Sequence, residues 1–298
     1  MREQKPVLTQ DVINLYDHFT HGGMDRRVFL DRLTRLVGGA AAAQGALALL
    51  QSNYAMAQVV PENDPRLMIN TLTYAGPNGP MSGYLCRLKG GAKRPAVLVI
   101  HENRGLNPHI RDVTRRLALD GFLAYGIDAL TPEGGTPADE DKARDMFGKI
   151  DINKTGENVA AAVGVLAKHA ESTGKVGAVG FCWGGGMVNQ VAWRAPELAA
   201  SVPYYGIQPP LDKVPLIKAA MLIHYAGTDE RINAGIEAYR KALTDAGKTF
   251  EIFIYEGTQH AFNNDTGAAR YNKAAADLAW GRTLAHFRKY LGEPPKGA

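Results

Sequence analysis

The sequence predicts an α/β fold with a mostly parallel central sheet, helices on both faces and an antiparallel hairpin at one edge. Short β-branched runs alternate with helical patterns through residues 96–290. The run at 96–100 is apolar without interruption, which is typical of a strand buried on both faces. Two alternating segments at 68–74 and 81–88, joined by a turn rich in Gly and Pro, indicate the hairpin.

The other elements follow in chain order. Asn107 and Pro108 predict a helix start, because asparagine caps a helix and proline fits its first turn. The next strand is expected at 122–127, and a polar loop rich in Gly and Pro follows it. The remaining expected elements are helices at 138–149 and 157–171, a strand at 176–179, a helix at 187–195, strands at 199–204 and 220–226, a helix at 232–246, a strand at 250–255 and a helix at 268–290.

Composition excludes several classes of protein. The chain has 34 Lys and Arg against 30 Asp and Glu, without a dense basic tract, so we expect no nucleic-acid partner. It has two cysteines, Cys86 and Cys182, which cannot provide a disulfide framework, although a bridge between them stays an alternative. His101 and Glu102 lack a second His or Cys at ligand spacing, so we expect no metal and no cofactor.

The N-terminal segment has the organisation of an export signal. Arg26 and Arg27 form a twin-arginine pair, an uncharged segment rich in Ala, Gly and Leu follows at 36–50, and 55–57 is a small-x-small cleavage site. The uncharged segment is short for a bilayer span of about 20 residues, so we expect no permanent membrane span.

We therefore expect residues 1–57 to be a twin-arginine signal peptide outside the fold, and residues 58–298 to be one α/β domain. The twin-arginine translocation machinery would then be a partner, and the protein would be periplasmic or otherwise exported. An amphipathic N-terminal helix that lies on the domain is the alternative. Translation from Met24 instead of Met1 is also open.

The segment around Cys182 predicts a nucleophile. Gly180, Cys182 and Gly184 form the G-x-nucleophile-x-G pattern between a short strand and a helix, with cysteine where serine is commoner. The glycines allow a sharp turn that would hold the thiol at the end of the sheet. The N-terminus of the following helix favours a thiolate and offers the Trp183 backbone N–H to an oxyanion. A small buried cysteine in a Gly-rich turn is the competing interpretation.

The order of residues along the chain favours catalysis. Asp229 follows the strand at 220–226, and His260 follows the strand at 250–255. In an α/β-hydrolase triad the nucleophile, the acid and the base follow one another in this order, and each lies just past a strand. A free cysteine is only a few per cent thiolate at neutral pH and needs such an activator.

These motifs resemble the dienelactone hydrolase family (carboxymethylenebutenolidases) of α/β-hydrolases over about residues 66–292. The resemblance is carried by Gly180-Phe-Cys-Trp-Gly-Gly185, the strand end Ile100-His-Glu102 with Gly105-Leu-Asn107, Gly227-Thr-Asp229 and His260-Ala-Phe262. It implies Cys182 as nucleophile, His260 as base, Asp229 as its orienting acid and Glu102 as the carboxylate that controls the thiol.

The same resemblance implies further site residues. The backbone N–H groups of Trp183 and Asn103 would form the oxyanion hole. The family often has an arginine for a substrate carboxylate where this chain has Asn264, which puts a carboxylate-bearing dienelactone in doubt. Arg104, beside Glu102, is a second candidate for substrate binding, with a solvated surface arginine as the alternative.

The sequence thus predicts an exported hydrolase that cleaves small esters or lactones through a Cys-His-Asp triad and a thioester intermediate. Acyl transfer and thiol redox chemistry are alternatives within enzymes, because an activated cysteine supports both. A catalytically silent accessory protein of an exported complex is the alternative outside enzymes, and the complete triad argues against it.

Overall fold

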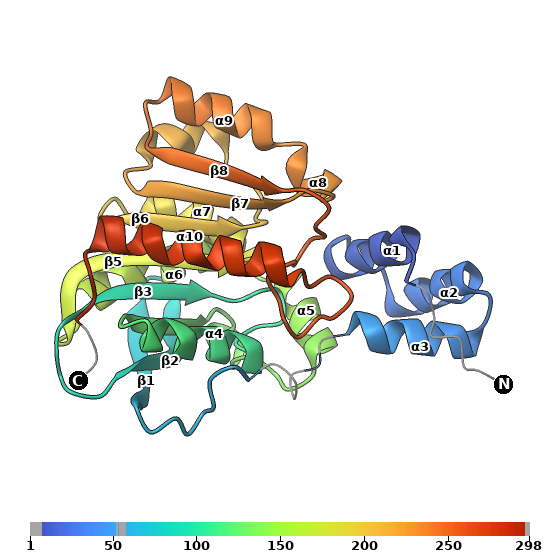
Figure 1. Ribbon diagram of the computed structural model, residues 1–298, viewed down its shortest axis with the longest axis horizontal. Coiled ribbons are helices and arrows are strands. Elements are labelled where there is room, and N and C mark those ends of the chain that lie inside the picture. Colours follow the sequence, from blue (N-terminus) through green and yellow to red (C-terminus); the bar gives the residue numbers. More distant parts are fainter. Residues whose placement is uncertain (1–7, 52, 54–57, 296–298) are drawn as a thin grey trace.

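The computed structural model describes residues 8–51, 53 and 58–295 of the chain. Within them, eight strands form one sheet in the order β1-β2-β4-β3-β5-β6-β7-β8 (Figure 1). The strands are β1 (Leu67–Gly76), β2 (Gly79–Leu88), β3 (Arg94–Ile100), β4 (Leu123–Asp128), β5 (Ser172–Phe181), β6 (Ala200–Tyr204), β7 (Ala220–Ala226) and β8 (Phe250–Tyr255). Strand β2 pairs antiparallel with β1 and β4, and the other pairs are parallel. The predicted fold class is confirmed.

Helices cover both faces of the sheet. One face packs against α6 (Ile152–Ala167), α7 (Trp183–Arg194) and α9 (Ile236–Asp245), and the other packs against α4 (Pro108–Leu119) and α10 (Lys273–Leu291). The described residues also form the short elements η2 (Thr131–Glu133), α5 (Glu140–Phe147), η3 (Leu211–Leu216) and α8 (Glu230–Asn233).

Side-chain alternation along β3 separates the two cores. Leu98 and Ile100 belong to the core with α6, whereas Val97 and Val99 belong to the core with α4, as the two-residue period of a strand requires. All of β3 is buried, which confirms the central strand. Cys86, on β2, is a buried free thiol, so the alternative disulfide with Cys182 is not formed.

Several helices differ from their predicted bounds, among them α7, which begins before residue 187, and α10, which begins at Lys273 after the capping residue Asn272 and not at residue 268. Capping and turn contacts explain two further differences. The helix expected at 157–171 begins at Ile152, since the Asp151 side chain accepts hydrogen bonds from the first turn, and it ends at Ala167. The helix expected at 232–246 is divided into α8 and α9 beside Gly235. A Cβ at Gly235 would lie 2.3 Å from Oε1 of Gln208, whose side chain fills this turn.

The N-terminal segment folds and packs against the described residues 58–295, called the catalytic domain below because they include the predicted triad. It forms α1 (Gln10–His21), α2 (Arg26–Val37) and α3 (Ala40–Leu50), which lie at the end of the sheet toward which the arrows of β3, β7 and β8 point (Figure 1). These helices share a small core of their own, in which the rings of Phe19 and Phe29 stack at 4.3 Å.

This packing corresponds to the alternative expectation, in which an amphipathic N-terminal helix lies on the domain, and not to a leader outside the fold. Removal of residues 1–57 stays a prediction, and the cleavage site at 55–57 lies outside the described residues. Among the described helices, no single one is long and apolar enough to cross a membrane. Helices α2 and α3 pass that test only together, and they are bent by 111°.

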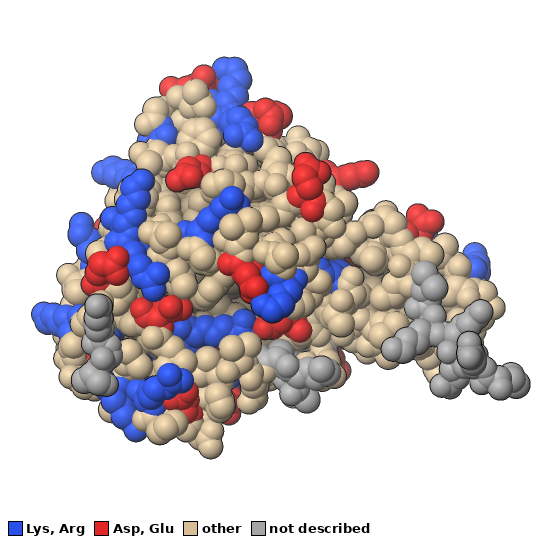
Figure 2. Space-filling model, viewed as in Figure 1, with Lys and Arg blue, Asp and Glu red and all other residues tan. Residues whose placement is uncertain are grey.

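Charged side chains are mixed on the face drawn in Figure 2. Lys and Arg alternate with Asp and Glu over the catalytic domain, and no single-sign patch covers this face. This distribution agrees with the nearly balanced composition of the chain.

Candidate active site

Cys182 lies at a sharp turn between β5 and α7. Its φ of 56° is unusual for a residue other than glycine, and such strain persists where surrounding structure enforces it. A Cβ on Gly180 would lie 2.3 Å from Gly184 O, and one on Gly184 would lie 2.3 Å from Ile100 O. The strand, sharp turn and helix predicted for this motif are confirmed, and they place the sulfur at the carboxyl end of the sheet.

Asp229 and His260 form a buried pair beside this turn. Asp229 follows β7 and caps α8, and His260 follows β8. His260 Nδ1 lies 2.5 Å from Asp229 Oδ2, and both side chains are buried. Among the described residues, His260 Nε2 has no hydrogen-bond partner, and a ring nitrogen of His260 lies within 4.8 Å of the Cys182 sulfur. The three residues predicted from chain order therefore come together.

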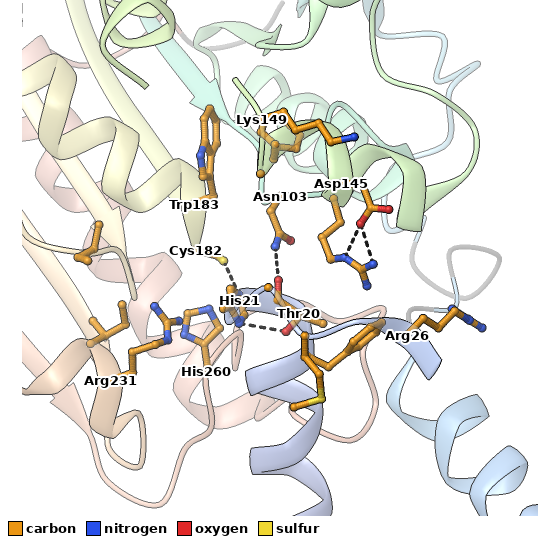
Figure 3. A pocket seen from close by; sticks show the side chains of 18 of the residues that line it. Thr20, His21, Arg26, Asn103, Asp145, Lys149, Cys182, Trp183, Arg231 and His260 are labelled. Carbon is orange, nitrogen blue, oxygen red and sulfur yellow. Dashed lines mark hydrogen bonds and ion pairs between the residues drawn. The ribbon is translucent and has the colours of Figure 1, made fainter. Parts of the chain in front are cut away.

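A second histidine also reaches the sulfur. His21, the last residue of α1, places Nε2 3.0 Å from Cys182 Sγ (Figure 3). Its Nδ1 lies 3.0 Å from Asp17 Oδ1, and its ring meets the His260 ring edge-on at a centroid distance of 4.7 Å. Cys182 thus lies beside two imidazoles, each of which has an aspartate carboxylate within ion-pair distance.

Sequence reasoning missed His21 because residues 1–57 were assigned to a leader. A local signal was present. Thr9 is a capping residue, and Val12, Tyr16 and Phe19 follow it at helical spacing, which predicts an amphipathic helix with a face to bury. The pattern predicts a packed helix, but it carries no information about the thiol 161 residues further along the chain.

The charges at this site depend on one another. Burial acts to raise the pKa of the Cys182 thiol, but the charges of His21 and His260 outweigh it and lower the pKa to about 6. Burial acts to lower the pKa of His260, but the charges of Cys182 and Asp229 raise it to about 10. The pKa of His21 is also raised, against burial, mainly by the charge of Cys182. At neutral pH the site therefore favours a thiolate beside imidazolium.

Glu102 is held by an amide. It follows β3 and is buried, and its Oε2 accepts a hydrogen bond from Asn264 Nδ2 at 2.8 Å. Asn264 Oδ1 accepts two more, from the Thr266 backbone N–H and hydroxyl. Asn264 therefore orients Glu102, and both ends of its amide are occupied within the protein. Glu102 borders a small cavity together with Cys182 and His260, and its control of the thiol stays a prediction.

Arg104 contacts the start of α5. Its Nη1 donates to Glu140 O at 2.9 Å and lies 3.2 Å from Asp141 Oδ1, and its side chain is only 11% exposed. It is therefore not a solvated surface arginine. It borders the small cavity beside Glu102, so a role in substrate binding stays a prediction.

The proposed oxyanion donors border the same space as the thiol. Trp183 is the first residue of α7, where a backbone N–H has no partner within its own helix. Asn103 lies in the loop after β3, and its side chain donates to Thr20 O at 2.8 Å. Trp183, Asn103 and Cys182 all line a cavity of about 610 Å³ (Figure 3).

This cavity is formed by the catalytic domain and by the N-terminal helices together. Phe19 and Met24 line it from the N-terminal side, and Phe147 and Ile207 line it from the domain. Donor atoms of His21, Cys182 and His260 lie within 4.8 Å of one another at this cavity.

Comparison with known proteins identifies the family. A family model described as the dienelactone hydrolase family matches residues 81–291, and a second, described as YqhI-like, matches residues 2–38. A Saccharolobus solfataricus protein named as a carboxymethylenebutenolidase is 32% identical over 230 residues, which cover 65% of this chain and 89% of that protein. A Bradyrhizobium protein named as a 2-oxo-3-(5-oxofuran-2-ylidene)propanoate lactonase is 33% identical over 222 residues, covering 70% and 89%.

A solved structure agrees with these relatives. The crystal structure named as a dienelactone hydrolase from Klebsiella pneumoniae has a TM-score of 0.65 and 28% identity, and the match covers 75% of this chain and all of that one. The residues matched by the dienelactone hydrolase family model include the sharp turn at Cys182, the Asp229–His260 pair and strands β3 to β8. The chain is therefore a hydrolase that belongs to the dienelactone hydrolase family.

Proposed function

We propose that the protein hydrolyses small esters or lactones, with Cys182 as nucleophile, His260 as base and acid, and Asp229 as the residue that orients His260. The observation that carries this proposal is the buried pair of Asp229 and His260, whose Oδ2 and Nδ1 atoms lie 2.5 Å apart, next to a thiol on a strained turn. The names of the relatives, which include a carboxymethylenebutenolidase and a lactonase, support esters and lactones as substrates.

In the acylation step, the Cys182 thiolate attacks the carbonyl carbon and a C–S bond forms. Negative charge moves to the carbonyl oxygen, where the Trp183 and Asn103 backbone N–H groups are the proposed donors. The C–O bond then breaks, and the His260 imidazolium gives its proton to the leaving alkoxide. With a lactone, the released hydroxyl stays attached to the acyl group.

In the deacylation step, neutral His260 removes a proton from water, and the resulting hydroxide attacks the thioester carbonyl. The C–S bond breaks, the carboxylic acid leaves, and Cys182 returns to the thiolate beside the His260 imidazolium. This is the charge state that the site favours at neutral pH, so no further proton transfer is needed to restore it.

A panel of small esters and lactones tests the proposal. We expect the wild-type protein to hydrolyse at least one class, and Cys182→Ala to reduce turnover to the uncatalysed rate. Cys86→Ala is the matched control, because Cys86 is the other buried free thiol and lies on β2 away from the cavity. Turnover that survives Cys182→Ala would contradict the proposal.

We also propose that the chain is exported through the twin-arginine pathway and that its signal is then removed. The support is the order of Arg26-Arg27, the uncharged segment and the small-x-small site in the sequence. Both arginines are exposed at the start of α2, where a receptor can reach them, although Arg26 also forms an ion pair with Asp141.

A further inference from the structure

Helices α1 and α2 contact the catalytic domain around the mouth of the active site. The contacts come from several segments that follow strands of the sheet. They are Asn103 to Thr20 O, the paired side-chain amides of Gln10 and Gln259, the ion pair of Arg26 with Asp141, the Arg144 guanidinium 4.2 Å from the Phe19 ring centre, and the Arg270 guanidinium 5.3 Å from the Tyr16 ring centre. The segment is thus seated on the site by polar and aromatic contacts on several sides.

The segment also recurs as a unit. The YqhI-like family model matches residues 2–38, which include all of α1 and α2, and this match is separate from that of the catalytic domain. Its core of Tyr16, Phe19, Phe29 and Leu33 is separate from the two cores of the sheet, and Ala269 of the catalytic domain packs against it. A unit with its own core, placed over the cavity, has the organisation of a cap.

His21 is the residue by which this unit reaches the sulfur. Its Nε2 lies 3.0 Å from Cys182 Sγ, whereas His260 Nε2 has no hydrogen-bond partner among the described residues. Asp17, one turn earlier on α1, lies 3.0 Å from His21 Nδ1, and a carboxylate at that position stabilises a positively charged imidazole. Asp17 and His21 thus form a second carboxylate–imidazole ion pair at the sulfur, in which the hydrogen-bonding contacts of His21 Nδ1 are to Asp17 O and Thr20 Oγ1.

We infer that residues 8–51 form an active-site cap, and that His21 is a positioning residue that holds Cys182 as a thiolate while the cap is closed. This inference deepens the proposed function and rests on Cys182 being its nucleophile. His21 occupies the hydrogen-bonding position at the sulfur, so a substrate that reaches the thiolate displaces the imidazole. Phe19 and Met24 line the cavity, so the cap also forms one wall of the substrate pocket.

The cap gives the N-terminal residues a role in the full-length chain. Cleavage at the predicted site would remove His21, Asp17 and the cavity wall together, and it would leave His260 as the remaining imidazole of the described site. Of the two histidine charges that lower the pKa of Cys182, that of His21 has the larger effect. The thiol of the full-length chain and that of the cleaved chain should therefore ionise at different pH.

The pH dependence of Cys182 alkylation by iodoacetamide tests this inference on the full-length protein. Quantifying the labelled peptide by mass spectrometry separates Cys182 from Cys86, and the pH midpoint reports thiolate formation while the plateau rate reports access. The charged or titratable groups around the sulfur are His21 and Asp17 from α1, Arg231 from α8, and Asp229, His260, Glu102, Tyr205 and Arg270.

We expect a wild-type midpoint near pH 6, and we expect His21→Ala to move it upward by about one unit or more. His21→Gln, which keeps a hydrogen-bonding side chain but no charge, should move it in the same direction, and it is the alternative variant if His21→Ala does not fold. Asp17→Asn should produce a smaller upward shift.

His18→Ala is the matched control, because His18 is an exposed histidine of the same helix, and its curve should superimpose on that of the wild type.

Midpoints of His21→Ala and His21→Gln that coincide with the wild type would overturn the cap inference, whatever the plateau rates are. Ester turnover measured on the same samples keeps the two proposals apart. A wild-type protein with a reactive Cys182 and no ester turnover would contradict the proposed function but not the cap inference. Normal ester turnover with unshifted pH midpoints would contradict the cap inference but not the proposed function.

Discussion

At the scale of single residues, the surroundings of the Cys182 sulfur decide the chemistry. Two aspartates hold two histidines against one thiol, and the charges of those histidines more than offset the cost of burying the thiolate. Glu102, a further carboxylate, borders the same small cavity and is held by Asn264. If Glu102 acts on the thiol as predicted, its negative charge opposes the effect of the two histidines.

The opposite signs give a prediction for Glu102→Gln. Loss of the negative charge should lower the apparent pKa of Cys182 and speed its alkylation at a pH below the midpoint, while ester turnover slows. Glu133→Gln, at an exposed glutamate of η2, should change neither quantity. Superimposed alkylation curves for wild type and Glu102→Gln would remove Glu102 from the catalytic residues.

The ionisation of the triad predicts the pH profile of kcat/KM. Attack needs the thiolate, so activity should rise as pH increases through about 6. Proton donation to the leaving group needs the His260 imidazolium, so activity should fall as pH increases through about 10. An initial-rate profile on a stable ester checks both limbs. A single limb that rises near the ordinary pKa of a free thiol would contradict a preformed thiolate.

At the scale of elements, close backbone packing fixes the nucleophile. Helix α7 approaches the turn after β6 so closely that a Cβ on Gly206 would lie 2.2 Å from the Gly185 carbonyl carbon. No side chain fits between these two backbones. The turn at Cys182 is thus packed against the turn after β6 and, through Gly184, against the end of β3 at Ile100. These contacts explain why its unusual φ is tolerated.

A pair of glycine substitutions tests this packing. Gly206→Ala should destabilise the protein by about 1–3 kcal/mol, because the backbones must move apart. Gly281→Ala should stabilise it by about 0.5–1 kcal/mol, since Gly281 lies inside α10 and a Cβ there has no neighbour within 4 Å. Urea unfolding of both variants measures the difference, and equal midpoints would show that the approach of α7 is not constrained as described.

Most elements of the catalytic domain are predictable from the sequence for physical reasons that act locally. The uninterrupted apolar run of β3 and the Asn107-Pro108 start of α4 each produce the expected element. The break between α8 and α9 was not predictable, because it depends on Gln208, which is distant along the chain. The order of Cys182, Asp229 and His260 predicted the triad because each residue follows a parallel strand, and such strand ends meet at one edge of the sheet.

At the scale of the whole molecule, the N-terminal segment connects two hypotheses. Its arginine pair and uncharged segment predict export, while its helices lie over the active site and place His21 at the thiol. Sequence patterns could not predict the second arrangement, because it depends on contacts between residues that are far apart in the chain. The cap and the leader share the same residues, so cleavage would change the chemistry of Cys182.

Replacement of Arg26 and Arg27 by lysine tests export. The twin-arginine route reads the arginine pair and not positive charge alone, so the double variant should stay in the cytoplasm as the full-length chain. Cell fractionation with immunoblotting measures the location, and Arg32→Lys on the same helix is a matched control that should be exported like the wild type. Unchanged export of the double variant would contradict the assignment.

Catalysis by Cys182 is tested most directly by trapping the acyl-enzyme. The protein is mixed with an activated acetate ester, quenched in acid during turnover and digested, and its peptides are analysed by mass spectrometry. We predict an acetyl group on the peptide that contains Cys182 in the wild type, and no acetylated peptide in Cys182→Ala. Turnover with the acetyl group on another residue, or with unmodified Cys182 throughout turnover, would contradict the thioester mechanism.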